Sequence, residues 1–83
     1  MASEQTREIV RRGQEIYDRD LRSQLEATNL HDFVAIEPES GEYFLGSTLS
    51  EAIEFARAVH PDRLCFAIRV GHRATVHMGV LLP

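Results

Sequence analysis

The side chains best suited to chemistry lie near the end of the chain, on two stretches that resemble strands. Cys65, Arg69 and His77 could supply a nucleophile, an anion clamp and a base. Thr75 belongs with them, because every second residue of a strand points to the same face of a sheet. Their spacing follows strand alternation and matches no catalytic geometry. We therefore expect Cys65, Arg69, Thr75 and His77 to form a binding surface, with no catalytic residues.

The sequence contains no recognisable metal or cofactor motif. The chain has four histidines and one cysteine, whereas a structural zinc site normally shows closely spaced pairs of these residues. No glycine-rich loop joins a strand to a helix in the way that phosphate cradles require. We expect neither a metal nor a cofactor. The histidines are His31 in a loop, His60 at a helix end, His72 in a turn and His77 on a strand.

Two acidic pairs, Asp18 with Asp20 and Glu37 with Glu39, have the spacing of paired carboxylates. Pro38 lies between the second two, and a proline among turn residues indicates a solvated loop. Neither pair is interpreted as a site of acid–base chemistry.

The charge balance disfavours nucleic acid as a partner. Thirteen acidic residues accompany nine arginines and no lysine, for a formal net charge of −4, whereas nucleic-acid binding is driven by a basic surface. Arg7, Arg11 and Arg12 cluster in the first predicted helix, but glutamates interleave with them. We interpret this cluster as an ion-paired, solvated helix face, and binding of nucleic acid through it is an alternative.

Two helices and two hairpins are expected to position these residues. Apolar side chains at spacings of three, four and seven predict a helix from Ser3 to Thr28, in which Gly13 marks close packing or a bend. Thr48 and Glu51 form a capping box that opens a second helix, and Pro61 ends it. The expected strands are 33–36, 43–45, 64–70 and 75–80.

This order predicts a single small α+β domain over residues 1–83, arranged as helix, hairpin, helix, hairpin. We expect a four-stranded, mostly antiparallel sheet with both helices packed on one face, and an open second face that carries Cys65 and Arg69. The first helix would be about 40 Å long, more than a compact domain of this size needs. Residues 1–12 are therefore expected to project or fray.

The sequence also bears on the compartment. A single cysteine fits a reducing environment. The charged N-terminal residues do not resemble a signal peptide, and no apolar run approaches the roughly 18 residues of a membrane span. We expect a cytoplasmic protein that makes no use of a membrane.

Several short motifs stand out between about Gly13 and Gly71. They are Ile16-Tyr17, Leu21-Arg22 with Leu25-Glu26, Phe33 to Ile36, Gly41 to Tyr43, Glu51-Ala52, His60-Pro61 and Ile68 to Gly71. Together these motifs resemble short, uncharacterised bacterial proteins, found mainly in cyanobacteria and planctomycetes, that are described as antitoxin-like. The resemblance implies a shared fold and a bacterial protein partner, and it implies no catalytic residues.

The function expected from the sequence is a non-enzymatic protein–protein interaction module that acts as a homodimer. It would bind another bacterial protein through its open sheet face, a bare strand edge or its long helix, and an antitoxin-like role is the most concrete version. The alternative is a small enzyme or ligand-binding domain that uses Cys65, Arg69 and His77.

Overall fold

The computed structural model describes residues 4–72 and 80–81. The chain begins with one long helical segment in three parts: α1 (Glu4–Ile16), the π-helix η1 (Tyr17–Leu21) and α2 (Arg22–Thr28). The predicted helix is therefore present over nearly its full length. It is not regular, because the Arg22 N–H donates to the carbonyl of Tyr17, five residues back.

The π-turn keeps one row of buried residues facing the sheet. These residues recur at every fourth position, whereas an α-helix turns once in 3.6 residues, so the row would drift around a regular helix. The wider turn in the middle offsets that drift. The row consists of Ile9, Gly13, Tyr17, Leu21 and Leu25.

A β-hairpin follows, as predicted. Strand β1 (Phe33–Ile36) pairs antiparallel with β2 (Tyr43–Gly46), in the register that puts Ile36 opposite Tyr43. Gly41 has φ +80°, a left-handed conformation that glycine adopts without steric cost. The turn residues between the strands thus set this register locally.

Helix α3 (Leu49–Val59) connects the hairpin to the last part of the sheet. The predicted cap is confirmed, since Thr48 Oγ1 accepts the Glu51 N–H at 3.1 Å. The Glu51 carboxylate reaches back to the N–H of Ser47 at 2.9 Å. After α3 come β3 (Cys65–Arg69) and the two-residue β4 (Val80–Leu81), and the strand order is β2-β1-β3-β4.

The predicted four-stranded, helix–hairpin–helix–hairpin arrangement is wrong. The sheet consists of three antiparallel strands, β2, β1 and β3, and β4 adds only a two-residue bridge opposite Cys65 and Phe66. All four residues of β1 pair with β3, a long-range contact that the alternation of β3 alone could not reveal. The remainder of the predicted fourth strand, 75–79, lies outside the described residues.

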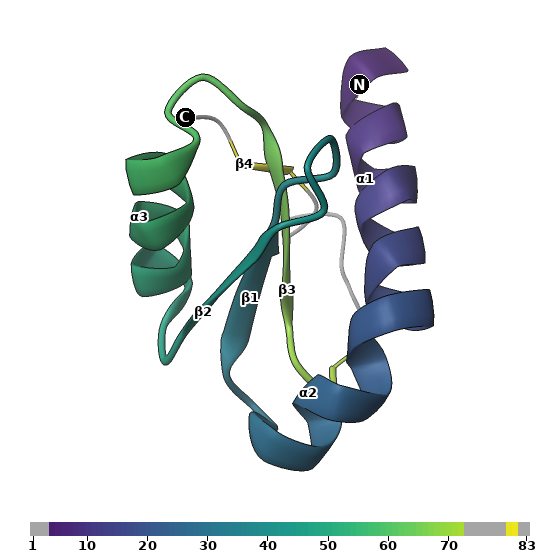
Figure 1. The fold of residues 1–83 in the computed structure, drawn as a ribbon, viewed down its shortest axis with the longest axis vertical. Helices are drawn as coiled ribbons and strands as arrows, with labels where there is room; N and C mark the ends of the chain where they lie inside the picture. Colours follow the sequence, from purple (N-terminus) through teal and green to yellow (C-terminus); the bar gives the residue numbers. More distant parts are fainter. Residues whose placement is uncertain (1–3, 73–79, 82–83) are drawn as a thin grey trace.

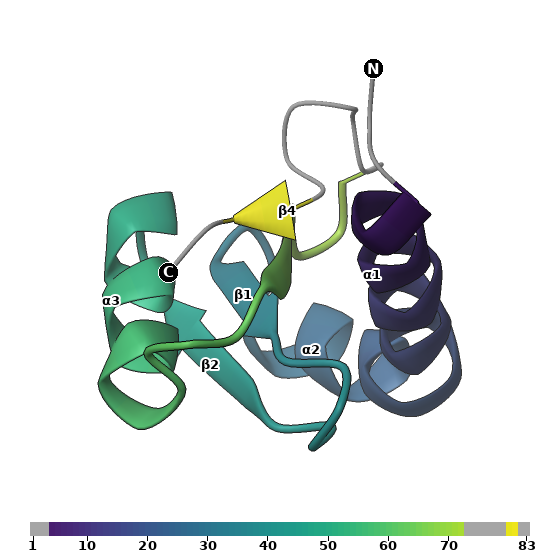
Figure 2. The same cartoon turned by 90° about the horizontal axis from the view of Figure 1, so that it is seen from above.

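The prediction that both helices share one sheet face is also wrong. Figures 1 and 2 show α1 on one side of the sheet and α3 on the other, so the molecule has three layers. The cause lies in β1, where Phe33 and Ala35 are apolar on one face and Val34 and Ile36 on the other. A strand that is apolar on both faces needs cover on both.

The α1 side holds the larger core. Tyr17 and Leu25 pack there against Ile36, Phe66 and Ile68, each at most 2% exposed.

Gly13 explains how closely α1 approaches the sheet. A Cβ atom at this position would lie 2.3 Å from Phe66 Cβ, so the absence of a side chain is what admits the Phe66 ring. Gly13 thus marks close packing, one of the two roles expected from the sequence.

The α3 side is built from small residues. Ala35 of β1 and Cys65 of β3 meet Ala52 and Ala56 of α3, with Phe44 packed at the margin. Small side chains on both surfaces let the helix lie close to the sheet.

Candidate functional site

The structure separates the residues expected to form a binding surface on an open sheet face. Cys65 is only 6% exposed and lies in the core beneath α3. Burial raises the pKa of the Cys65 thiol, and the nearby charge of Glu37 raises it further. A thiol in this environment is a poor nucleophile, because the reactive form is the thiolate. Thr75 and His77 lie outside the described residues.

Arg69 is exposed and has a structural role at the end of β3. Its Nε donates to the carbonyl of His31 at 2.9 Å, and its guanidinium lies over the Phe33 ring, 5.3 Å from the centroid. These contacts tie the end of β3 to the start of β1 and to the loop before it. Arg69 and the Cys65 thiol therefore do not share an open surface.

Of the three clustered arginines, Arg11 shows the ion pairing that the sequence predicts. It pairs with Glu8 and Glu15 on exposed helix surface, whereas Arg12 reaches the carbonyl of Pro38 at 3.5 Å. An arginine that is paired with two glutamates offers little to a phosphate backbone.

The prediction that Glu37 lies in a solvated loop is wrong, since its side chain is only 1% exposed. Its carboxylate accepts the N–H groups of Glu39 at 2.8 Å and Ser40 at 3.0 Å, and it pairs with Arg63 at 3.3 Å. Burial alone would raise the pKa of Glu37, but these hydrogen bonds and the Arg63 charge hold it below its ordinary value. Glu37 thus anchors the hairpin turn to the loop before β3.

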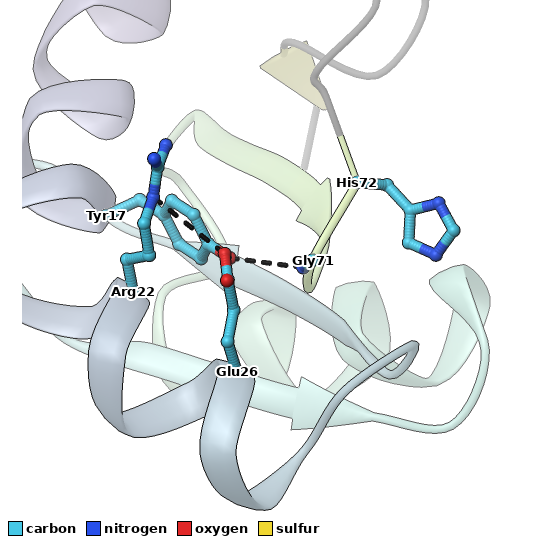
Figure 3. Close-up of a pocket in the computed structure, with 5 residues that line it drawn as sticks. All are labelled: Tyr17, Arg22, Glu26, Gly71 and His72. Atoms are coloured by element: carbon cyan, nitrogen blue, oxygen red, sulfur yellow. Dashed lines mark hydrogen bonds and ion pairs between the residues drawn. The ribbon is translucent and has the colours of Figure 1, made fainter.

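A polar pocket of about 440 Å³ opens beside the π-turn, lined by Tyr17, Arg22, Glu26, Gly71 and His72. Figure 3 shows the Tyr17 hydroxyl between Glu26 and the backbone of Gly71, with His72 directed away from them. The hydroxyl donates to Glu26 at 3.1 Å and accepts the Gly71 N–H at 3.3 Å. These bonds join the helical segment to the end of β3.

The chemistry available to this pocket is limited. Burial raises the pKa of Tyr17, although the Gly71 N–H opposes the shift, so the phenol stays protonated. Arg22 lies over the Tyr17 ring, 5.6 Å from its centroid, and is paired with Asp18 and Glu26. The polar groups of the pocket are already engaged in hydrogen bonds and ion pairs with one another. Their arrangement is therefore more typical of a tertiary contact that holds two segments together than of an active site.

The outer edge of β2 is an open hydrogen-bonding surface. The Glu37 N–H donates to the Glu42 carbonyl at 2.9 Å, so Glu37 and Glu42 are a hydrogen-bonded pair of the β1–β2 ladder. The next pair, Ile36 with Tyr43, is then a non-bonded one. Because bonded and non-bonded pairs alternate in an antiparallel ladder, Tyr43 and Leu45 direct their N–H and C=O groups away from β1. No described strand lies beyond β2.

A second feature lies beside this edge. The chain passes from β2 through α3 to β3 with β1 between the two strands, and Figures 1 and 2 show a right-handed connection. Ala52 and Ala56 face the sheet, so the turn of about 100° per residue puts Phe55 and Val59 on the flank of α3 beyond β2. Phe55 is 49% exposed and Val59 is 53% exposed. We call the outer edge of β2, with Phe55 and Val59, the edge surface.

The sequence contains a weak signal for the edge surface. Phe55 and Val59 are spaced four apart, a spacing typical of a buried helix face, but Ala52 and Ala56 occupy the buried face of this helix. A helix with both an alanine row and a large apolar row has more apolar surface than one sheet can cover.

Two features are absent from the described residues, 4–72 and 80–81. No helix there has the length and apolar character needed to cross a membrane. Within 4–72 and 80–81, no three histidine, cysteine or acidic side chains gather in a metal-binding group.

No family model, no curated protein and no solved structure matches the chain. The resemblance to bacterial antitoxin-like proteins therefore rests on the sequence motifs alone.

Proposed function

We propose that this protein is a non-enzymatic protein–protein interaction module that forms a homodimer through the edge surface. The observation that carries the proposal is the unpaired edge of β2 beside two exposed apolar side chains, Phe55 and Val59. Unpaired strand edges readily add another strand, and apolar neighbours strengthen the contact.

The composition of β2 supports this use. Natural proteins protect free edges with lysine, proline, inward charges or bulges. Strand β2 (Tyr43–Gly46) has none of these, and its register with β1 is continuous. An edge without protective features indicates that pairing is tolerated or used.

The proposed partner is a second copy of the chain, because β2 is self-complementary. Tyr43 of one copy pairs with Leu45 of the second, a register that engages all the outward groups of both strands. Phe44 then meets its counterpart at the two-fold axis, and Glu42 lies opposite Gly46 rather than opposite a like charge. The three-stranded sheets would merge into one, with the Phe55 and Val59 flanks facing each other.

An antitoxin-like role, in which the dimer binds a second bacterial protein in the cytoplasm, is the most specific version of this proposal. It is supported by the motif resemblance and by a lone cysteine suited to a reducing compartment.

The decisive experiment is a dilution series of the purified chain by light scattering. The expected result is a mass twice the 9.4 kDa of one chain at high concentration, falling on dilution. Tyr43→Pro removes an outward N–H at the first residue of the strand, where proline is tolerated, and it should yield a monomer. Tyr43→Ala is the matched control, because it removes the same side chain and keeps the N–H.

The apolar flank is tested separately. Lysine at both Phe55 and Val59 should weaken dimerisation at least about tenfold, since burying two charges opposes association. Glu54→Lys, on exposed surface of the same helix turned away from β2, is the control and should leave the dimer intact. A wild-type chain that is monomeric at every concentration, or a Tyr43→Pro variant that still dimerises, would overturn the proposal.

A further inference from the structure

We propose that His31 and His72 form a binding site for a late divalent transition metal such as Ni²⁺ or Cu²⁺. Nδ1 of His31 lies 2.8 Å from Nε2 of His72, although the two residues are 41 positions apart in the chain. Nothing in the local spacing of the histidines indicates this pair. The fold brings it together.

The nitrogen separation fits two neighbouring ligands of one metal ion. Metal–nitrogen bonds of about 2.0–2.1 Å at a right angle put the two nitrogens about 2.8–3.0 Å apart, whereas a tetrahedral angle puts them about 3.3–3.4 Å apart. Right-angled coordination by nitrogen and oxygen is typical of Ni²⁺ and Cu²⁺, and imidazole suits both ions.

The backbone around the pair is fixed by the sheet. The His31 N–H donates to the Val70 carbonyl at 3.0 Å, and the Val70 N–H donates to the Asp32 carbonyl at 2.7 Å. His31 has φ +76°, a left-handed conformation that is rare for residues other than glycine and that often marks functional positions. These contacts hold the two turns side by side, so little ordering is needed when an ion binds.

The surroundings leave room for the remaining ligands. Both histidines are exposed, and His72 also lines the polar pocket that holds Glu26. A metal ion held by two imidazoles can therefore take water or an anion at its other positions. With only two protein ligands, the site would exchange its ion readily.

A direct hydrogen bond between the two rings gives the same distance without a metal. Calorimetric titration of the tag-free chain with NiCl₂ at pH 7.5 distinguishes the two. The expected result is one Ni²⁺ bound per chain.

Three variants define the site. His31→Asn, which tolerates the left-handed backbone, and His72→Gln should each weaken Ni²⁺ binding more than about tenfold, since one imidazole cannot chelate. The double variant should lose less than the sum of the two single losses, because either single change already removes the chelate. His60→Gln is the control, because His60 is engaged by Glu42 at 2.7 Å, and it should bind as wild type does.

Unfolding curves recorded without metal confirm that each variant folds. Absence of Ni²⁺ binding by the wild-type chain would overturn the proposal. Equal binding by His72→Gln, or loss of binding in His60→Gln, would also overturn it.

Discussion

The two faces of the sheet are filled by side chains of different size. On the α1 face, large residues such as Tyr17, Leu25 and Phe66 are almost completely buried, whereas the α3 face is closed by Ala35, Ala52, Ala56 and Cys65. Buried area scales with side-chain size, so most of the hydrophobic stabilisation comes from the α1 face. The α3 face gains close contact between helix and sheet instead, and two large side chains of its helix, Phe55 and Val59, remain exposed.

The largest expected effect tests this division directly. Phe66→Ala should lower the free energy of unfolding by about 3–5 kcal/mol, because it leaves a cavity in the larger core. Phe55→Ala removes the same side chain from the exposed flank of α3 and should change stability by no more than about 0.5 kcal/mol. Urea unfolding of dilute protein measures both. Similar losses for the two variants would contradict the division.

The loop anchor at Glu37 should have the next largest effect. Glu37→Gln should cost about 1.5–3 kcal/mol at pH 7, because hydrogen bonds to a charged group are lost. The folded-state pKa of Glu37 lies below its ordinary value, so its contribution is present above the unfolded pKa and is lost as the pH falls through the folded pKa.

This pH dependence can be measured by urea unfolding of wild type and variant at pH 7 and at pH 3. The stability difference between them should shrink at the lower pH. A difference that stays constant would show that the Glu37 charge does not stabilise the turn.

The third prediction concerns the tight α3 face. Ala56→Leu should cost about 1–3 kcal/mol, because the added atoms have no space between helix and sheet. Ala58→Leu adds the same atoms at an exposed position of α3 and should have little effect. Equal stability of the two variants would mean that the small residues do not set the helix–sheet distance.

The features that depended on neighbouring residues were predictable from the sequence. The first hairpin, the Thr48 cap and the extent of the first helix follow from turn chemistry, capping and periodicity. The apolar pattern of β1 also indicates that both faces of the sheet are covered, since neither face of this strand carries a charge. The prediction that both helices lie on one face did not take this pattern into account.

The features that depended on distant residues were not predictable. The β1–β3 pairing, the burial of Glu37 beside Arg63 and the contact between His31 and His72 each join segments 26 to 41 positions apart. Strand alternation placed Cys65 and Arg69 on one face correctly, but it could not show that α3 covers Cys65.

The π-turn at Tyr17–Leu21 has a consequence for how this sequence tolerates changes in length. A π-turn holds one residue more than the same turn of a regular α-helix, so removing one residue, such as Arg19, would make the helix regular and would rotate its upstream part little about the axis. The buried row would then follow spacings of four, four, three and four, and Ile9 and Gly13 would still face the sheet. Removing a residue between Gly13 and Tyr17 would instead rotate the upstream part by about 100° and would move Gly13 away from Phe66. Among natural variants of this chain, loss of one residue should therefore be tolerated in the π-turn and selected against in the turn before it.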